Sequence, residues 1–199
     1  MAVKTSAVIL TLGRSPLLVS CLEALRRDGG PALEILLVDQ GENPADLPAG
    51  LADKILRPGR NLGFAAGNNL GIAAASGDWV AAVNDDAVVE PGWLGSLIAA
   101  LEAYPGAAAA QGVNVLLAAP ETADGWGLAW NRWWQATQLG HGEPVPPPKV
   151  EVREIFGASA TAVVYRRQAL RQVAIGGEVF DPRLFDRPRR RAATSQRLP

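Results

Sequence analysis

The stretch from Asn61 to Leu94, NLGFAAGNNLGIAAASGDWVAAVNDDAVVEPGWL, guides our interpretation of the whole chain. Within it, residues 78–83 form a short apolar run after Gly77, which is typical of a strand buried on both faces. The polar cluster Asn84–Asp86 follows this strand directly. Ligands of open α/β sheets bind at the carboxyl ends of the strands. The sequence therefore puts two adjacent carboxylates where a ligand would bind.

These residues alone leave two interpretations of Asp85 and Asp86. Like charges side by side repel each other, so the pair needs either solvent or a cation beside it. A solvated turn between strand and helix satisfies that need, and so does a cation-assisted diphosphate site. Mg²⁺ or Mn²⁺ usually takes only one or two protein carboxylates and completes its shell with phosphate oxygens and water. Because His141 is the single histidine, a multi-histidine zinc site is excluded.

The composition is that of a globular protein without a strong net charge. Its 199 residues, 48% hydrophobic and 20% charged, predict one domain with a sizeable core. Nineteen basic and 20 acidic residues give a formal net charge of -1, which does not favour nucleic acid as a partner. The single cysteine, Cys21, favours a reducing compartment. Since no apolar run is long enough to span a bilayer, we expect a cytoplasmic protein.

Strand-like and helix-like segments alternate along the chain, which predicts βαβ units and an α/β fold with a mostly parallel sheet. Gly63, Gly67 and Gly71 recur every fourth residue, and we expect them to allow close helix–sheet packing. A phosphate cradle is the alternative, but no Gly-Lys-Ser/Thr follows. Strands are expected at 6–11, 34–39, 54–56, 79–83, 107–117 and within 153–166, and helices from Ser15-Pro16 to Gly29-Gly30, from about 63 to 75, from Pro91, and over 167–173.

Two segments depart from this alternation. Residues 118–150 contain four tryptophans, and four prolines lie within 144–148; we expect a lid or an acceptor-side loop within the domain 1–182. Its tryptophans either stack on sugar rings or lipid, or cover an exposed sheet edge. Residues 183–199 contain six arginines and one acid, which predicts a disordered tail rather than a nucleic-acid arm.

Several polar positions converge at one edge if the sheet is parallel. They are the turn 11–14, Asp39, Arg60-Asn61 and the cluster 84–86. Asp39 ends its strand and is placed to accept hydrogen bonds from a ribose or a base. Arg60 offers a fork of donors to a phosphate.

Taken together, these motifs resemble family 2 glycosyltransferases with the GT-A fold, and most closely a rhamnosyltransferase-like branch. The resemblance implies a nucleoside-diphosphate sugar donor (a UDP- or dTDP-sugar), Mg²⁺ or Mn²⁺, and inversion at the anomeric carbon by direct displacement. For such an enzyme we expect a saccharide or lipid-linked acceptor, and a location in the cytoplasm leaves room for a peripheral contact with the inner face of the membrane. The segments that carry the resemblance are AVILTLGRSPLLVSCLEAL, EILLVDQGENPA, GRNLGFAAGNNLGIAAASGDWVAAVNDDAVVEPGWL and FGASATAVVYRR, within about 3–186.

The resemblance also implies roles for the residues around the carboxylate pair. Asn84–Asp86 matches the family's Asp-x-Asp position, so Asp86 would bind the cation and Asp85 would lie against the ribose or diphosphate. Thr11 and Asp39 would hold the nucleobase and ribose. Arg60 would lie beside the donor.

Three further positions follow from the same resemblance. Asn69 falls in a Gly-Asn-Asn segment, where it has either a donor contact or a structural role. Gly157 belongs to the segment that lines the sugar and acceptor side. After residues 180–185 such enzymes usually continue into an acidic Glu-Asp motif that supplies the base, whereas here Asp186 is followed by arginines. Either Asp186 is the base, or the chain is a truncated or frame-altered form without one, and we expect the second.

Two other functions stay open at this point. One is a catalytically inactive module for nucleotide-sugar binding or assembly. The other is a sugar-1-phosphate nucleotidyltransferase, although residues 13–16 are a poor version of the glycine- and arginine-rich loop of that class.

Overall fold

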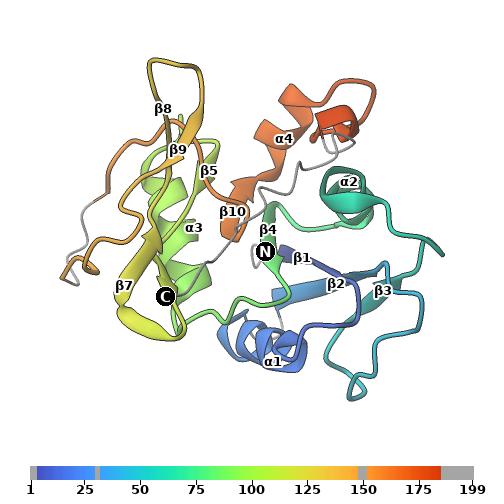
Figure 1. Ribbon diagram of the computed structural model, residues 1–199. Helices are drawn as coiled ribbons and strands as arrows, with labels where there is room; N and C mark the ends of the chain where they lie inside the picture. Colours follow the sequence, from blue (N-terminus) through green and yellow to red (C-terminus); the bar gives the residue numbers. More distant parts are fainter. Residues whose placement is uncertain (1–3, 30–31, 148–151, 185–199) are drawn as a thin grey trace, which may run out of the picture.

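A six-stranded sheet forms the centre of the computed structural model, which describes residues 4–29, 32–147 and 152–184 (Figure 1). The strand order is β3-β2-β1-β4-β10-β5. The first four strands in this order are parallel, and β10 is antiparallel to both β4 and β5. The expected α/β fold with a mostly parallel sheet is confirmed.

The bounds of most elements agree with the sequence prediction to within two residues. Among the described residues no helix is long and apolar enough to cross a membrane. In chain order the elements are β1 (Thr5–Thr11), α1 (Leu18–Gly29), β2 (Leu33–Asp39), β3 (Lys54–Leu56), α2 (Gly63–Ala74), β4 (Trp79–Asn84), α3 (Trp93–Ala103), β5 (Ala109–Ala110), β6 (Asn114–Leu116), β7 (Ala119–Gly125), β8 (Leu128–Trp130), β9 (Ala136–Gln138), β10 (Ala162–Arg166), α4 (Arg167–Val173) and the 3₁₀ turn η2 (Pro182–Leu184).

The strand expected over 107–117 is wrong as one element, because the chain changes partner within it. Its first part, β5, pairs with β10, whereas its second part, β6, pairs with β7 in a separate two-stranded sheet. Gln111, between the two, accepts a hydrogen bond from the backbone N–H of Ser159 at 2.6 Å. The strand expected within 153–166 is likewise shorter, since only Ala162–Arg166 pairs in the main sheet.

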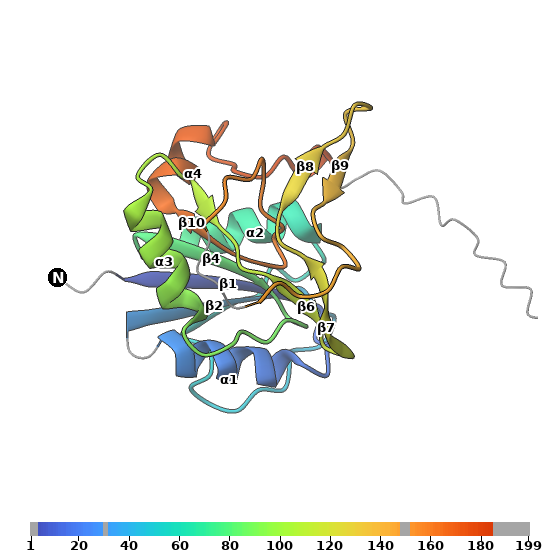
Figure 2. The same ribbon diagram turned by 90° about the vertical axis from the view of Figure 1, so that its left-hand side faces the viewer.

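The central strands are buried on both faces, as their apolar runs predict. Alternate residues of β1, such as Ala7 and Ile9, face the layer formed by α1 and α3. Their neighbour Val8 faces the opposite layer, where α2 and α4 pack with Leu170 in the core. Figure 2 shows the helices α1 and α2 on opposite sides of the sheet. This packing makes β1, β2 and β4 a rigid support for the loops at their carboxyl ends.

Two of the regularly spaced glycines allow α2 to lie close against β1. A Cβ atom added at Gly71 would overlap the Cγ1 atom of Val8, and one at Gly67 would lie 2.7 Å from Cδ2 of Leu10. Gly63 instead starts the helix with a left-handed φ of 76°. The expected packing role is therefore confirmed for Gly67 and Gly71.

We expect Gly71→Ala to lower the free energy of unfolding by about 2 kcal/mol, because the new methyl group overpacks a closed interface. Gly95 on α3 is the matched control, since a Cβ there meets nothing within 4 Å. Gly95→Ala should raise stability by up to about 1 kcal/mol through helix propensity alone. Urea denaturation followed by circular dichroism measures both. Equal stabilisation by the two substitutions would contradict close packing at Gly71.

The excursion over 118–150 contains more regular structure than a loop. Strand β7 pairs with β6, and β8 pairs with β9 as a hairpin that projects from the body of the molecule (Figures 1 and 2). Leu128 of β8 also forms an isolated bridge with Gly157. This bridge joins the excursion to the segment that precedes β10.

Candidate functional site

The strand register brings three predicted positions together at the carboxyl edge of the sheet. On one side of β1, Thr11 lies opposite Asp39 of β2. On the other side, Leu10 lies opposite Asn84 of β4. The Thr11 hydroxyl donates a hydrogen bond of 2.6 Å to the Oδ2 atom of Asp85. Residues that are 74 positions apart in sequence therefore meet at one point.

Asp85 is half-buried and held from two sides. The Ser15 hydroxyl donates to its backbone carbonyl at 3.0 Å, in addition to the bond from Thr11 to its side chain. Burial raises the pKa of the Asp85 carboxyl, the neighbouring Asp86 raises it further, and the hydrogen bond from Thr11 opposes the shift. The site therefore retains an uncompensated repulsion between two carboxylates.

Asp86 is exposed, and its side chain makes no hydrogen bond with any described residue. Its oxygens are hard ligands that suit Mg²⁺ or Mn²⁺. Within the described residues no group of three or more His, Cys, Asp or Glu side chains is arranged for a metal ion. A divalent cation here would take its remaining ligands from water and from a bound diphosphate. The residues present fit such an ion, because it would also relieve the repulsion between Asp85 and Asp86.

Cys21 lies beneath this cluster, with its Sγ atom 3.4 Å from the carbonyl oxygen of Asn84. Burial raises the pKa of the thiol to about 12, and the charges of Asp85 and Asp86 add to the shift. Because the thiolate is the reactive form of cysteine, Cys21 is a packing residue and not a nucleophile.

Asp39 organises the loop that follows β2. Its carboxylate accepts hydrogen bonds from the backbone N–H groups of Gly41 at 3.2 Å and Ala45 at 3.0 Å. The Nε atom of Arg57 lies 3.3 Å from the same carboxylate, whose side chain is only 1% exposed. Asp39 therefore shapes the 40–45 loop beside Thr11, and its direct contact with a ligand stays a prediction.

Arg57, which the sequence analysis did not single out, is the arginine that reaches Asp39. Arg60, the residue that we had selected, is exposed and forms no ion pair or hydrogen bond with the described part of the chain. The relevant signal is the register of two parallel strands. Leu56 of β3 lies opposite Val38 of β2, so the next residues along each strand are Arg57 and Asp39.

Asn69 has a structural role, which is one of the two roles that the sequence left open. Its Oδ1 atom accepts hydrogen bonds from the N–H groups of Val179 at 3.1 Å and Phe180 at 2.9 Å, and its Nδ2 atom donates to the Phe180 carbonyl at 2.7 Å. The Phe64 and Phe180 rings stack edge-on, with centroids 5.8 Å apart. These contacts hold the segment around residue 180 against α2, and nothing joins Asn69 to the carboxylate pair among the described residues.

Gly157 lies on a segment that approaches the site from the other side. It exchanges backbone hydrogen bonds with Leu128, at 2.7 and 3.2 Å. Four residues later the Thr161 carbonyl accepts the N–H of Asn84 at 2.9 Å. The segment 157–161 therefore borders the cluster 84–86, whereas Asp186 lies outside the described residues.

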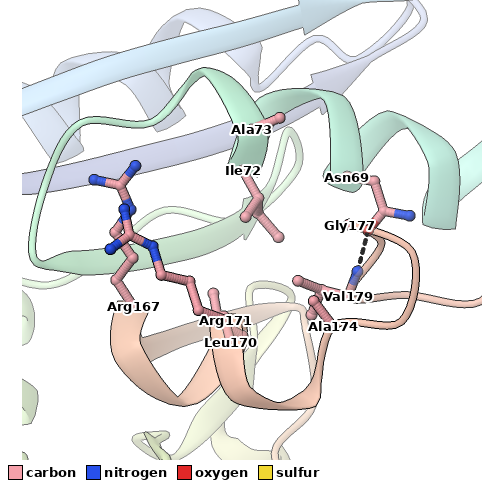
Figure 3. A pocket seen from close by; sticks show the side chains of 9 residues that line it. All are labelled: Asn69, Ile72, Ala73, Arg167, Leu170, Arg171, Ala174, Gly177 and Val179. Carbon is pink, nitrogen blue, oxygen red and sulfur yellow. Dashed lines mark hydrogen bonds between the residues drawn. The ribbon is translucent and has the colours of Figure 1, made fainter.

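The cavity in Figure 3 is not part of this site. It has a volume of about 450 Å³ and lies between α2, α4 and the turn that follows α4. Arg167 on its wall donates to the carbonyls of Ala75 and Gly77, which precede β4, while Asp85 follows β4. The cavity is lined by Asn69, Ile72, Ala73, Arg167, Leu170, Arg171, Ala174, Gly177 and Val179.

Solved structures with a similar backbone are GT-A glycosyltransferases, which confirms the predicted fold. A mannosyltransferase from Pyrobaculum calidifontis, in complex with GDP-Man and Mn²⁺, is 16% identical with a TM-score of 0.54 over 86% of this chain and 46% of its own. GalNAc-T7 with UDP, GalNAc and Mn²⁺ is 14% identical with a TM-score of 0.61 over 92% and 38%. Residues 1–349 of TarS from S. aureus are 16% identical with a TM-score of 0.56 over 92% and 53%. The chain thus spans between 38% and 53% of these proteins.

The family follows from a separate comparison. Residues 6–173 match the model of glycosyl transferase family 2, and the chain belongs to this family. The predicted class of protein, a family 2 glycosyltransferase, is thereby confirmed. A search of curated proteins finds no match.

Proposed function

We propose that the chain transfers a sugar from a nucleoside-diphosphate sugar to an acceptor hydroxyl, with inversion at the anomeric carbon and with a divalent cation. The observation that carries this proposal is the 2.6 Å hydrogen bond from Thr11 to Asp85, which joins the ends of β1 and β4 directly beside the exposed Asp86. Mn²⁺ with GDP-Man or UDP in two structures of the same fold supports a nucleotide-sugar donor and a cation.

The site residues divide between binding the donor and admitting the acceptor. Asp86 would hold Mg²⁺ or Mn²⁺ against the diphosphate, and the cation would neutralise the departing diphosphate. Thr11 fixes Asp85 in position for the ribose or diphosphate. The 40–45 loop, which Asp39 and Arg57 hold in place, would border the nucleobase.

The acceptor side would consist of other segments. The segment 157–161 lies beside Asn84 and is placed to line the space where the acceptor enters. Direct displacement requires a carboxylate within hydrogen-bond reach of the acceptor hydroxyl. The sequence favours a chain without this base, but an enzyme that transfers the sugar needs one, and we therefore propose Asp186, the acid that follows residues 180–185, for the role. A saccharide or a lipid-linked saccharide is the proposed acceptor, and Arg60 would lie beside the donor phosphates.

Calorimetry with UDP-, dTDP- and GDP-sugars, each with and without Mn²⁺, tests the proposal. We expect one donor to bind only when Mn²⁺ is present. The resemblance to the rhamnosyltransferase-like branch favours a UDP- or dTDP-sugar over a GDP-sugar. Failure of all three donors to bind in the presence of Mn²⁺ would overturn the proposal.

A transfer assay separates an enzyme from an inactive binding module. Release of the nucleoside diphosphate on addition of acceptor should be seen with the unmodified chain and lost in Asp186→Asn, while donor binding is retained. Donor binding without any release would support a binding module. Pyrophosphate release from a sugar 1-phosphate and a nucleoside triphosphate would support a nucleotidyltransferase instead.

A further inference from the structure

The β8–β9 hairpin and Phe156, which packs against Trp130, expose a cluster of aromatic side chains that the proposed donor site does not use. We call this cluster the tryptophan tip; it consists of Trp130, Trp133, Trp134 and Phe156. Their exposed fractions are 46%, 67%, 83% and 71%. The hairpin projects beyond the body of the molecule in both views (Figures 1 and 2). Large aromatic surfaces exposed in this way indicate an interaction site.

The tryptophan tip is a built structure and not a loose loop. Asn131 at the turn accepts hydrogen bonds on Oδ1 from the N–H groups of Trp133 at 2.8 Å and Gln135 at 3.1 Å. Its backbone N–H donates to the Gln135 carbonyl at 3.0 Å. The rings of Trp130 and Phe156 pack edge-on, with centroids 5.6 Å apart. The indoles are therefore presented on a fixed support.

Trp134 occupies a backbone conformation that normally selects glycine. Its φ is 58°, and it is the one non-glycine residue with a positive φ among the described residues. A left-handed conformation costs a bulky residue roughly 1–2 kcal/mol, and glycine at this position would avoid that cost. The Trp134 side chain is exposed and contributes little to the core, so packing does not explain this conformation. Such an outlier points to a function for the side chain.

The charge around the tryptophan tip indicates what it binds. Between residues 126 and 140 the one charged residue is Arg132. Its guanidinium carbon lies 4.6 Å from the centroid of the Trp133 ring. Tryptophan concentrates at the membrane–water interface, where the ring lies at the level of the headgroups. An arginine beside it adds attraction to anionic lipids.

The projecting hairpin suits contact with the surface of a bilayer better than it suits enclosure of a ligand in a pocket. The hairpin projects from the body of the molecule, and the cavity in Figure 3 is formed by other elements. Trp126, the remaining tryptophan of the excursion, lies against Gly140 at the base of the hairpin. The exposed rings can therefore enter a bilayer, whereas within the part of the chain that the structure describes they form no pocket that would enclose a ligand.

We propose that the tryptophan tip inserts into the interface of an anionic phospholipid bilayer. The hairpin is joined through the Leu128–Gly157 bridge to the segment that borders Asn84. A membrane contact at the tip would therefore bring the carboxyl edge of the sheet toward the lipid headgroups. This inference uses residues that the proposed donor site does not, so each can fail separately.

Cosedimentation of the full chain with vesicles tests the proposal. We expect stronger partitioning into vesicles of phosphatidylcholine with phosphatidylglycerol than into phosphatidylcholine alone. Trp134→Gly should weaken partitioning into both by about tenfold, because one large apolar side chain is lost from the interface. The melting temperature of Trp134→Gly should be maintained or raised, because glycine adopts a positive φ without strain. Arg132→Gln should weaken binding by about fivefold, and only for the anionic vesicles.

Tyr104→Ser is the matched control, because Tyr104 is an aromatic residue with 52% exposure at the end of α3. It should partition like the unmodified chain, and all variants should keep the same calorimetric binding of the donor. Absence of partitioning into either vesicle would overturn the proposal, as would equal losses in Trp134→Gly and Tyr104→Ser. Oligosaccharides that quench tryptophan fluorescence without vesicle binding would assign the tip to a saccharide. A dimer that Trp134→Gly dissociates would assign it to a second copy of the chain.

Discussion

Replacing Asp86 with alanine is expected to weaken Mn²⁺-dependent donor binding by about a hundredfold, because the cation loses a direct ligand. Thr11 would still hold Asp85, so the fold should be unchanged, and without Mn²⁺ the melting temperature should be maintained or raised because the repulsion between Asp85 and Asp86 is removed. Binding in the presence of Mn²⁺ should fall to the level seen without the ion. Titration of the donor by calorimetry, with and without Mn²⁺, measures this loss.

Asp78→Ala is the matched control for this experiment. Asp78 is an exposed aspartate that precedes β4, whereas Asp86 follows the same strand at its other end. Removing either acid changes the net charge equally, but only Asp86 belongs to the proposed cation site. Equal losses of binding in the two variants would indicate a general charge effect and count against cation binding at Asp86.

Glu34→Gln should produce the largest loss of stability, about 3 kcal/mol at pH 7. Glu34 is only 7% exposed at the amino end of the sheet. Its carboxylate accepts hydrogen bonds from the Ser6 hydroxyl at 2.6 Å, the Ser76 N–H and hydroxyl at 3.0 and 2.8 Å, and the Lys54 ammonium at 2.9 Å. Burial alone raises the pKa of Glu34, but these hydrogen bonds outweigh it and lower the pKa to about 2.

The stabilisation by Glu34 should decrease as the pH falls, because the pKa of its carboxyl is lower in the folded chain than in the unfolded chain. The folded-state pKa of about 2 lies below the ordinary value of 4.5, so the unfolded chain takes up the proton first as the pH falls. The stabilisation is complete above the ordinary value and is lost as the pH falls toward 2. The difference between the unmodified chain and Glu34→Gln should therefore shrink to about half near pH 3.

Urea denaturation at several pH values measures this difference. Glu23, which is exposed on α1, provides the control, and Glu23→Gln should leave the unfolding free energy unchanged at every pH. A loss of stability in Glu34→Gln that stays constant down to pH 2 would show that packing, and not the charge of Glu34, is responsible.

The central strands could be predicted from the sequence because burial on both faces leaves a direct signal. Residues 35–38 and 79–83 are apolar throughout and are followed by polar residues, and they appear within β2 and β4. The β8–β9 hairpin leaves no comparable signal. Its strands have three residues each, and its tryptophans face solvent, so neither alternation nor a hydrophobic run marks them.

The location of the candidate site could be predicted from the sequence, but the side-chain contacts within it could not. A parallel sheet brings Thr11, Asp39 and Asp85 to one edge whatever the details of packing. Which arginine approaches Asp39 depends on the register of β3, and a difference of three residues separates Arg57 from Arg60. The role of Asn69 depends on a backbone segment 110 residues further along the chain, a distance over which sequence spacing has no predictive value.

Because β10 runs antiparallel to β5, the excursion between them can change without disturbing β1, β2 and β4. The chain leaves the sheet after β5 and re-enters it at β10, its antiparallel neighbour, and the bond between Ser159 and Gln111 closes the two ends of the excursion. Everything between them can lengthen, shorten or be exchanged at a small entropic cost. The domain is therefore modular: this insert can be exchanged as one piece, while β1, β2 and β4 keep their alignment and hold Thr11, Asp39 and Asp85 at one edge.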